Sequence, residues 1–143
     1  EELLALPEEA AASEAIDEEE RVLIEQVIEF WDTVVHEVMV PRPDITAVSN
    51  NDTIDTAASI VIEHGFSRVP VFGENIDDIK GIIYSKDIMR SLRDDSSSAE
   101  VSTIMREPFY VPEAKKISQL LREMQAETVL MAIVIDEYAV LYL

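Results

Sequence analysis

The spacing of apolar residues predicts three helices in the first part of this chain, over residues 17–32, 54–64 and 85–92. In the first, an acidic turn precedes large apolar residues at helical spacing, so this helix should be amphipathic. Gly65 is placed to end the second helix as a left-handed cap. Asp87 falls in the first turn of the third helix. The apolar stripe of the first helix consists of Ile24, Val27, Ile28, Phe30 and Trp31.

Short runs of β-branched and aromatic residues predict strands over 45–48, 68–72 and 79–84. Pro41 and Pro43 exclude an α-helix through residues 40–44, and we expect extended chain there. Pro70 lies inside the second predicted strand. Because proline has no N–H to donate to a ladder, the sequence predicts that Pro70 lies at a sheet edge or at a bulge.

After a polar linker at 93–98 the pattern restarts, which indicates an internal repeat. A single constant offset aligns the two copies without a gap, pairing Val48 with Val111, Ile54 with Ile117, Val71 with Val134, and Phe72 with Ile135. The same offset places the counterpart of Asp87 at about position 150, beyond the last residue. We therefore expect the two copies to supply unequal halves of any site between them.

The order of these elements favours an α+β fold built from two tandem β-α-β-β-α repeats that share one core. We expect an acidic leader and connector helix over 1–35, a first repeat over 36–95, and a second repeat over 96–143 that is incomplete at its C-terminal end.

Composition and charge narrow the functional classes. The net charge of −19 argues against nucleic-acid binding, which needs cations to displace phosphate counterions. There is no cysteine, which excludes disulfides and thiolate chemistry. No apolar run approaches the roughly 20 residues that cross a bilayer, and no signal peptide is visible, so we expect a soluble chain. Ten acids against one base in residues 1–25 indicate a solvated helical face or flexible leader, or alternatively a cation-collecting arm.

The residues that could carry catalysis form no known motif. His36 and His64 lack partners at metal-binding spacing, and Gly65, Gly73 and Gly81 stand alone, which excludes a phosphate-binding loop. Acid pairs such as those at 77–78 and 94–95 could bind Mg²⁺ weakly, but solvated turns explain them more simply. There is no nucleophile elbow. The sequence therefore predicts that the chain is not an enzyme.

Three segments resemble the first cystathionine-β-synthase-type (CBS) domain of the CorC/HlyC family of bacterial magnesium and cobalt efflux-associated, hemolysin-like proteins. They are residues 38–42 (Val-Met-Val-Pro-Arg), 64–71 (His-Gly-Phe-Ser-Arg-Val-Pro-Val) and 81–87 (Gly-Ile-Ile-Tyr-Ser-Lys-Asp). Residues 131–138 (Met-Ala-Ile-Val-Ile-Asp-Glu-Tyr) resemble the second CBS domain, so the resemblance covers about residues 17–138. It implies a CBS pair, or Bateman module, on the cytoplasmic face of a membrane transporter. It also implies AMP or ATP, with or without Mg²⁺, as a regulatory ligand, and a homodimer.

Asp87 is the main candidate for ligand binding. A carboxylate at a cleft mouth can accept hydrogen bonds from both ribose hydroxyls. Local sequence alone favours an acid that complements the helix dipole, whereas the family pattern favours ribose binding. Arg68 could bind phosphate or form a surface salt bridge. Thr46 and Ala47 could line an adenine slot with backbone groups, and the apolar pair that follows Arg68 could form a wall or pack in the core. The expected ligand-binding residues are Thr46, Ala47, Arg68, Val69, Pro70, Tyr84, Ser85 and Asp87.

Two departures from the family pattern keep an alternative open. Residues 139–143 (Ala-Val-Leu-Tyr-Leu) stand where the family continues with paired glycines and a strand that ends in Glu-Asp. Tyr84 stands where CBS domains that bind nucleotides often carry Thr or Ser, with Ser85 one position away. The alternative is a ligand-free structural or dimerisation module, and a third hypothesis is an acidic metal buffer.

Overall fold

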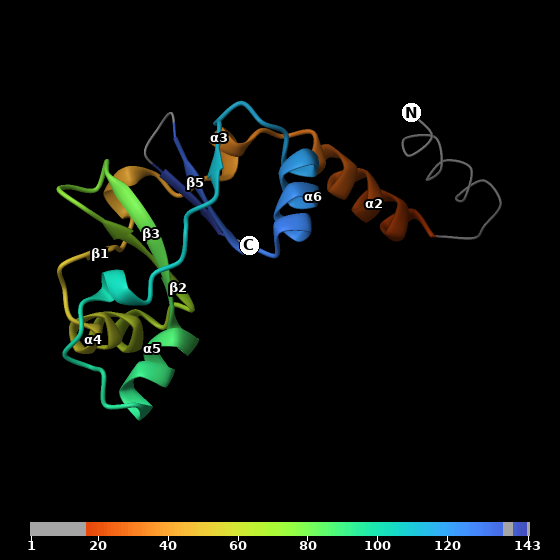
Figure 1. The fold of residues 1–143 in the computed structure, drawn as a ribbon. Coiled ribbons are helices and arrows are strands. Elements are labelled where there is room, and N and C mark those ends of the chain that lie inside the picture. Colours follow the sequence, from red (N-terminus) through yellow and green to blue (C-terminus); the bar gives the residue numbers. More distant parts are fainter. Residues whose placement is uncertain (1–16, 136–138, 143) are drawn as a thin grey trace.

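A three-stranded sheet forms the centre of each of two repeats in the computed structural model, which describes residues 17–135 and 139–142 (Figure 1). The first sheet has the strand order β1 (Val48–Ser49), β2 (Arg68–Phe72), β3 (Ile79–Tyr84). The second sheet has the strand order β4 (Tyr110–Val111), β5 (Met131–Val134), β6 (Ala139–Tyr142). In both sheets the first strand pairs parallel with the second, which forms an antiparallel hairpin with the third. The expected α+β fold is confirmed.

Helices flank the two sheets as the apolar pattern predicts. The α-helices are α2 (Glu18–Trp31), α3 (Val35–Val38), α4 (Ile54–His64), α5 (Ser85–Arg93) and α6 (Ile117–Glu127), and the 3₁₀ turns are η1 (Arg42–Asp44) and η2 (Val101–Thr103). The three helices predicted in the first part of the chain are confirmed. Gly65 ends α4 at φ 71°, as expected for a left-handed cap.

The internal repeat is confirmed for the helix and the strand that follows it. The offset that pairs Ile54 with Ile117 relates both ends of α6 to those of α4, and it also relates the start of β5 to the start of β2. The match extends to the helix caps, because Thr128 follows α6 at φ 58° where Gly65 follows α4 at φ 71°. The two copies thus share backbone conformation even where the residue type differs.

Strand β6 is a third strand of the second repeat that the sequence analysis did not predict. In the first hairpin Arg68 pairs with Tyr84, whereas in the second Met131, the counterpart of Arg68, already pairs with Tyr142. The second hairpin is therefore shorter than the first, and this shortening hides the strand from a search at a constant offset.

Pro70 lies in the central strand of its sheet, so the prediction of an edge was wrong, and the register shift of this strand falls just beyond it, between Val71 and Phe72. It pairs with Ile82, whose N–H and C=O both bond to Arg106 on the far side of β3. Pro70 and Ile82 therefore form a pair that exchanges no hydrogen bonds, and the nitrogen of Pro70 faces β1. The ladder between β1 and β2 starts only at Val48 and Val71, just past the proline.

Because Pro70 cannot donate a bond to the preceding residues of the first strand, β1 is shorter than predicted. It covers Val48–Ser49 instead of 45–48, so Thr46 and Ala47 lie before the strand, half-buried. Residues 42–44 form a 3₁₀ turn instead of the expected extended chain, and the fixed φ of proline suits such a turn.

Three apolar clusters hold the molecule together, instead of the single shared core that the sequence predicted. The first repeat packs α4 and α5 on its sheet through residues such as Ile54, Val61, Val69, Ile83 and Ile88. The second packs α3 and α6 on its sheet through Val35, Val111, Leu120, Met124 and Ala132. A smaller cluster of Ile82, Met131 and Ile133 joins the two sheets. Each repeat therefore has its own core, and a third cluster couples them.

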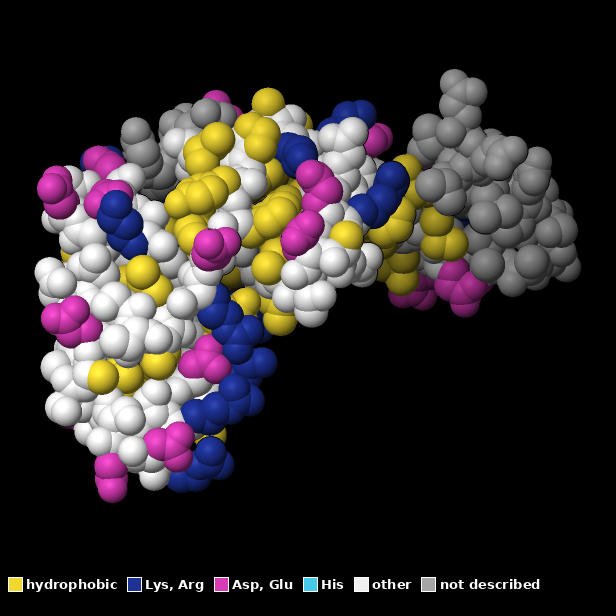
Figure 2. Space-filling view, in the orientation of Figure 1, with side chains coloured by type: hydrophobic (Ala, Val, Ile, Leu, Met, Phe, Trp, Pro, Cys, Tyr) yellow, Lys and Arg dark blue, Asp and Glu magenta, His cyan; other side chains and the backbone are white. Residues whose placement is uncertain are grey.

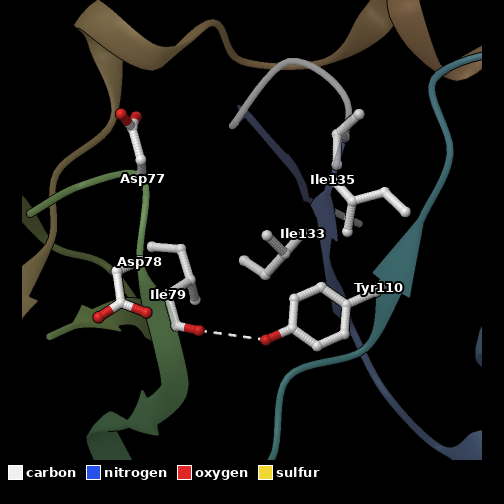
Figure 3. A pocket seen from close by; sticks show the side chains of 7 residues that line it. Asp77, Asp78, Ile79, Tyr110, Ile133 and Ile135 are labelled. Atoms are coloured by element: carbon white, nitrogen blue, oxygen red, sulfur yellow. Dashed lines mark hydrogen bonds between the residues drawn. The ribbon is translucent and has the colours of Figure 1, made fainter.

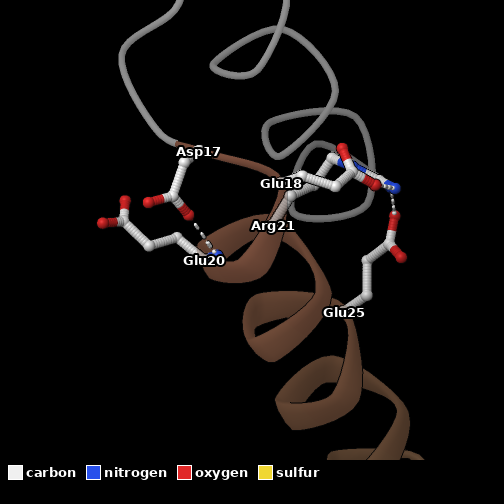
Figure 4. A network of polar contacts seen from close by, with 5 residues as sticks. All are labelled: Asp17, Glu18, Glu20, Arg21 and Glu25. Carbon is white, nitrogen blue, oxygen red and sulfur yellow. Dashed lines mark hydrogen bonds and ion pairs between the residues drawn. The ribbon is translucent and has the colours of Figure 1, made fainter.

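Helix α2 begins with a network of acidic and basic side chains (Figure 4). The Asp17 carboxylate accepts a hydrogen bond from the Glu20 N–H at 2.8 Å and so caps the helix. Arg21 forms ion pairs with Glu18 and, at 2.6 Å, with Glu25. The predicted amphipathic helix therefore starts at a side-chain cap.

The apolar stripe of α2 is mostly uncovered. The helix lies beside α6, but none of its residues is buried, and Leu23, Phe30 and Trp31 are exposed. Amphipathic spacing thus predicted the helix without predicting burial of its apolar face. Within residues 17–135 and 139–142, no helix combines the length and apolar content needed to span a membrane.

Candidate functional site

A cavity of about 360 Å³ lies between the two repeats, beside the start of α5. Tyr84 and Lys86 line it from the first repeat, and Arg106 lines it from the segment that leads to β4. The end of α6 and the loop after it complete the wall with Met124, Gln125, Thr128, Val129 and Leu130. Both repeats therefore contribute to this cavity.

The β3–α5 junction and the neighbouring strand backbone fix the positions of these side chains. Tyr84 ends β3 and caps α5, and the Ser85 N–H bonds to the Ser67 carbonyl at 2.9 Å. The Arg106 backbone exchanges two hydrogen bonds of 2.8 Å with Ile82 on β3. Gly81 permits this approach, because a Cβ there would lie 2.8 Å from the Arg106 carbonyl oxygen.

Asp87 and Arg106 form a bidentate ion pair beside the cavity. Arg106 Nε donates to Asp87 Oδ2 at 2.9 Å, and Nη2 donates to Oδ1 at 3.1 Å. Arg90 adds a longer contact of 3.4 Å to the same carboxylate. The hydrogen bonds that Arg106 donates to Asp87 raise the pKa of Arg106, so this guanidinium stays charged. Both oxygens of the predicted ribose acceptor are therefore already engaged by arginine.

The ring of Tyr84 is surrounded by three cations. The Arg106 guanidinium lies 4.2 Å from the ring centroid, the Lys86 ammonium 5.8 Å, and the Arg68 guanidinium 5.9 Å. The Nε atom of Arg68 is buried and forms no hydrogen bond to any residue that the structure describes. A buried donor without an acceptor is unfavourable, so Arg68 can gain from an added oxygen ligand.

A strip of Lys and Arg runs along this side of the molecule (Figure 2). Helix α5 adds Arg90 and Arg93 to the three cations around Tyr84. In a chain of net charge −19, this concentration of positive charge is unusual. Arginine and lysine at a cavity rim bind phosphate or carboxylate groups, so the arrangement suits an anionic ligand.

The structure brings together four of the residues that the sequence analysis selected. Arg68, Tyr84, Ser85 and Asp87 lie where β2 begins, β3 ends and α5 starts. Lys86, the residue between Ser85 and Asp87, lines the cavity with Tyr84. Arg106 was not predicted from the sequence, because its irregular segment carries no motif and only the fold brings it to Asp87.

The other selected residues lie further from the cavity. Val69 is completely buried in the core of the first repeat, which corresponds to the core-packing alternative. Pro70 is buried opposite Ile82, and Thr46 and Ala47 lie ahead of β1. None of the four is among the residues that line the cavity.

A second cavity of about 260 Å³ lies near the opposite end of β3 (Figure 3). Ile79, Tyr110 and Ile133 form its interior, and the Tyr110 hydroxyl donates to the Ile79 carbonyl at 3.1 Å. The acid pair Asp77 and Asp78 contributes to its rim, where Arg42 and Lys80 pair with them. Within the described residues, no three acids or histidines group in a way that could hold a metal ion. The first cavity is therefore rich in cations and the second in carboxylates.

Comparisons with known proteins agree with this architecture. A family model described as the CBS domain matches residues 35–94. The magnesium and cobalt efflux protein CorC of Salmonella typhimurium is 36% identical over 137 residues, which make up 96% of this chain and 47% of that protein. The chain spans about half the length of the curated relatives that it matches.

Solved structures extend the similarity. The CBS domain of a bacterial CNNM/CorC family Mg²⁺ transporter, in complex with an inhibitor, has a TM-score of 0.87 at 33% identity, covering 99% of this chain and 90% of that one. In complex with ATP, the values are 0.77 at 34% identity, covering 87% and 88%. A hemolysin-like protein containing a CBS domain, from Oenococcus oeni PSU, has a TM-score of 0.77 at 39% identity, covering 83% and 90%. The relatives from the CorC and CNNM/CorC families are named as transport proteins, and the Oenococcus oeni protein is named as hemolysin-like.

Proposed function

The chain belongs to the CBS domains of the CNNM/CorC family of Mg²⁺ transporters, and on that premise we propose that it binds an adenosine nucleotide beside Asp87 and passes this occupancy to Mg²⁺ or Co²⁺ transport. The membrane domain of a longer transporter would be its partner, with this chain on the cytoplasmic face. A ligand that prefers one arrangement of the two repeats would shift the population of that arrangement and so regulate transport.

The cationic cluster around Tyr84 is the observation that carries this proposal. Arg68, Lys86 and Arg106 offer several donors to a phosphate chain, and the buried Nε of Arg68 has no other partner among the described residues. The volume of the adjoining cavity falls within the range of about 300–1,000 Å³ that is typical of small-molecule sites. The crystallised complex of a related CBS domain with ATP supports the same ligand class.

The other parts of the nucleotide are assigned from the family resemblance. Asp87 would accept hydrogen bonds from the ribose hydroxyls, and the Ser85 hydroxyl lies at the same helix start. Thr46 and Ala47, which do not line the cavity, would receive the adenine with backbone groups, beside Pro70. The proposal leaves Val69 out of ligand contact, since its side chain is completely buried in the first core.

Titration calorimetry with AMP, ADP and ATP, each with and without Mg²⁺, tests the proposal. We expect binding by the native chain and at least about tenfold weaker binding by Arg68→Met, which keeps the apolar stem and removes the donors. Arg42→Met is the matched control, because Arg42 pairs with Asp77 at the rim of the other cavity. Absence of heat at millimolar nucleotide would refute the sensing role.

A ligand-free dimerisation module is the second candidate, and two observations favour it. Asp87 is already saturated by Arg106, and Ile62 on α4 and Met89 on α5 are 78% and 65% exposed. Such apolar side chains suit the contact surface of a homodimer formed through the repeats. Light scattering decides this point: dimers that persist without nucleotide and dissociate in Ile62→Asp would support it, and monomers would contradict it.

A further inference from the structure

Arg106 occupies the carboxylate that a ribose would need. If Asp87 accepts the ribose hydroxyls as proposed above, both of its bonds from Arg106 must first break. We infer that Arg106 exchanges partners when a nucleotide binds, releasing Asp87 to the ribose and taking a phosphate oxygen instead. The site would then select phosphorylated nucleosides over free adenosine, a selectivity that rests on the proposed function.

The position of Arg106 suits such an exchange. Its side chain is 44% exposed and already lines the cavity, so it can reach a ligand there. It contacts Asp87 through Nε and Nη2, which leaves Nη1 outside that pair. The guanidinium lies 4.2 Å from the centroid of Tyr84, and this aromatic surface can support it while its anionic partner changes.

The Asp87 carboxylate, unlike the more exposed Arg106, needs a hydrogen-bond partner at every stage. Its side chain is only 13% exposed, and without Arg106 it would retain only the 3.4 Å contact with Arg90. A carboxylate in this position needs hydrogen-bond donors, which Arg106 supplies in the ligand-free protein and two ribose hydroxyls would supply in the complex. The exchange therefore keeps Asp87 paired at both stages.

The selectivity for phosphorylated nucleosides depends on whether the Arg106 guanidinium gains a new anionic partner when the ligand binds. When ATP binds, Arg106 loses a carboxylate and gains a phosphate, so the number of charge-assisted bonds is preserved. When adenosine binds, Arg106 loses the carboxylate and gains no anion in return. Adenosine is therefore rejected through the cost of breaking an existing pair, in addition to lacking phosphate contacts.

Calorimetric titration of Arg106→Ala with ATP and with adenosine tests the exchange. We expect ATP to bind about tenfold more weakly than to the native chain and adenosine about tenfold more tightly, because nothing then competes for Asp87. Arg42→Ala is the matched control, since it removes an equal charge from an ion pair at the rim of the other cavity. It should leave the ratio of ATP to adenosine affinity within about twofold of native. Circular dichroism and thermal melting of each variant verify that it folds.

The outcomes separate this inference from the proposed function. Unchanged or weaker adenosine binding by Arg106→Ala would overturn the exchange, while ATP binding by the native chain would leave the proposed function intact. If the native chain binds neither ligand and Arg106→Ala binds adenosine, Arg106 only blocks the ribose acceptor, and both the exchange and the sensing role fail. If neither protein binds either ligand, both ideas fail.

Discussion

Thr128 ends helix α6 in the left-handed region, at φ 58°, where the first repeat uses glycine. A β-branched side chain is strained in that region, whereas glycine is not. We expect Thr128→Gly to raise the free energy of unfolding by about 1 kcal/mol, measured by urea denaturation. Asp95→Gly is the control, because Asp95 has a similar φ of 57° but is a residue type that tolerates it. An equal gain in both variants would contradict the role of β-branching.

Arg21 sets the protonation of Glu18 at the start of α2. Its hydrogen bond holds the pKa of Glu18 below the ordinary value of 4.5. A carboxyl whose pKa is lower in the folded state stabilises the helix above pH 4.5, and this contribution is lost as the pH falls through the folded pKa. In Arg21→Gln we expect the pKa of Glu18 to rise towards its ordinary value, as followed by carbon-detected NMR titration. Arg122→Gln should leave it unchanged, and a rise there would point to a general charge effect.

Among the elements, strand β3 depends on Gly81 for its contact with the segment that carries Arg106. In Gly81→Ala the new Cβ would lie 2.8 Å from the Arg106 carbonyl oxygen and from Met105 Sδ. We expect a loss of roughly 1–3 kcal/mol in urea denaturation, typical of overpacking, together with weaker nucleotide binding as Arg106 is displaced.

Gly65→Ala provides the contrast for this experiment. Nothing lies within 4 Å of a Cβ at Gly65, so the cost of about 1 kcal/mol comes from its positive φ alone. Nucleotide affinity should not change. Equal effects of the two variants on affinity would show that the Gly81 contact does not position Arg106.

The sequence predicted those elements whose signals are local. The constant offset between the repeats located α6 and β5 correctly, because capping and apolar spacing are properties of short segments. It did not locate β6, since the shortened second hairpin breaks the offset. It misplaced Pro70, because only the register shows that the proline nitrogen faces β1 just before the ladder between β1 and β2 begins.

The candidate site, too, was predictable only where its residues lie close together in the sequence. Tyr84, Ser85 and Asp87 are nearly contiguous, and a strand-to-helix junction brings them to one place. Arg106 reaches Asp87 from a distant part of the sequence through a backbone contact with β3, which no local pattern reveals. The fold also decides that Val69 points into the core, whereas alternation along a short strand leaves either face open.

For the whole molecule, the cluster between the sheets couples the two repeats. Met131 on β5 is buried there with Ile82 of β3, while Met124 is buried in the core of the second repeat alone. Both substitutions to alanine should cost roughly 2–5 kcal/mol. In Met131→Ala we also expect faster amide hydrogen exchange across β3 of the first repeat, and in Met124→Ala faster exchange confined to the second. The same exchange pattern in both variants would contradict a separate coupling cluster.

The basic strip beside α5 has a consequence for how quickly a nucleotide arrives. An anion that comes within about a Debye length of the surface, about 8 Å at physiological ionic strength, is repelled by the overall charge of −19, and only near the strip is the local potential attractive. Added salt therefore lowers the barrier to approach and weakens the final contacts at the same time. For ATP, added salt should therefore raise the association rate constant while it lowers the equilibrium affinity. The bound nucleotide then has a shorter residence time.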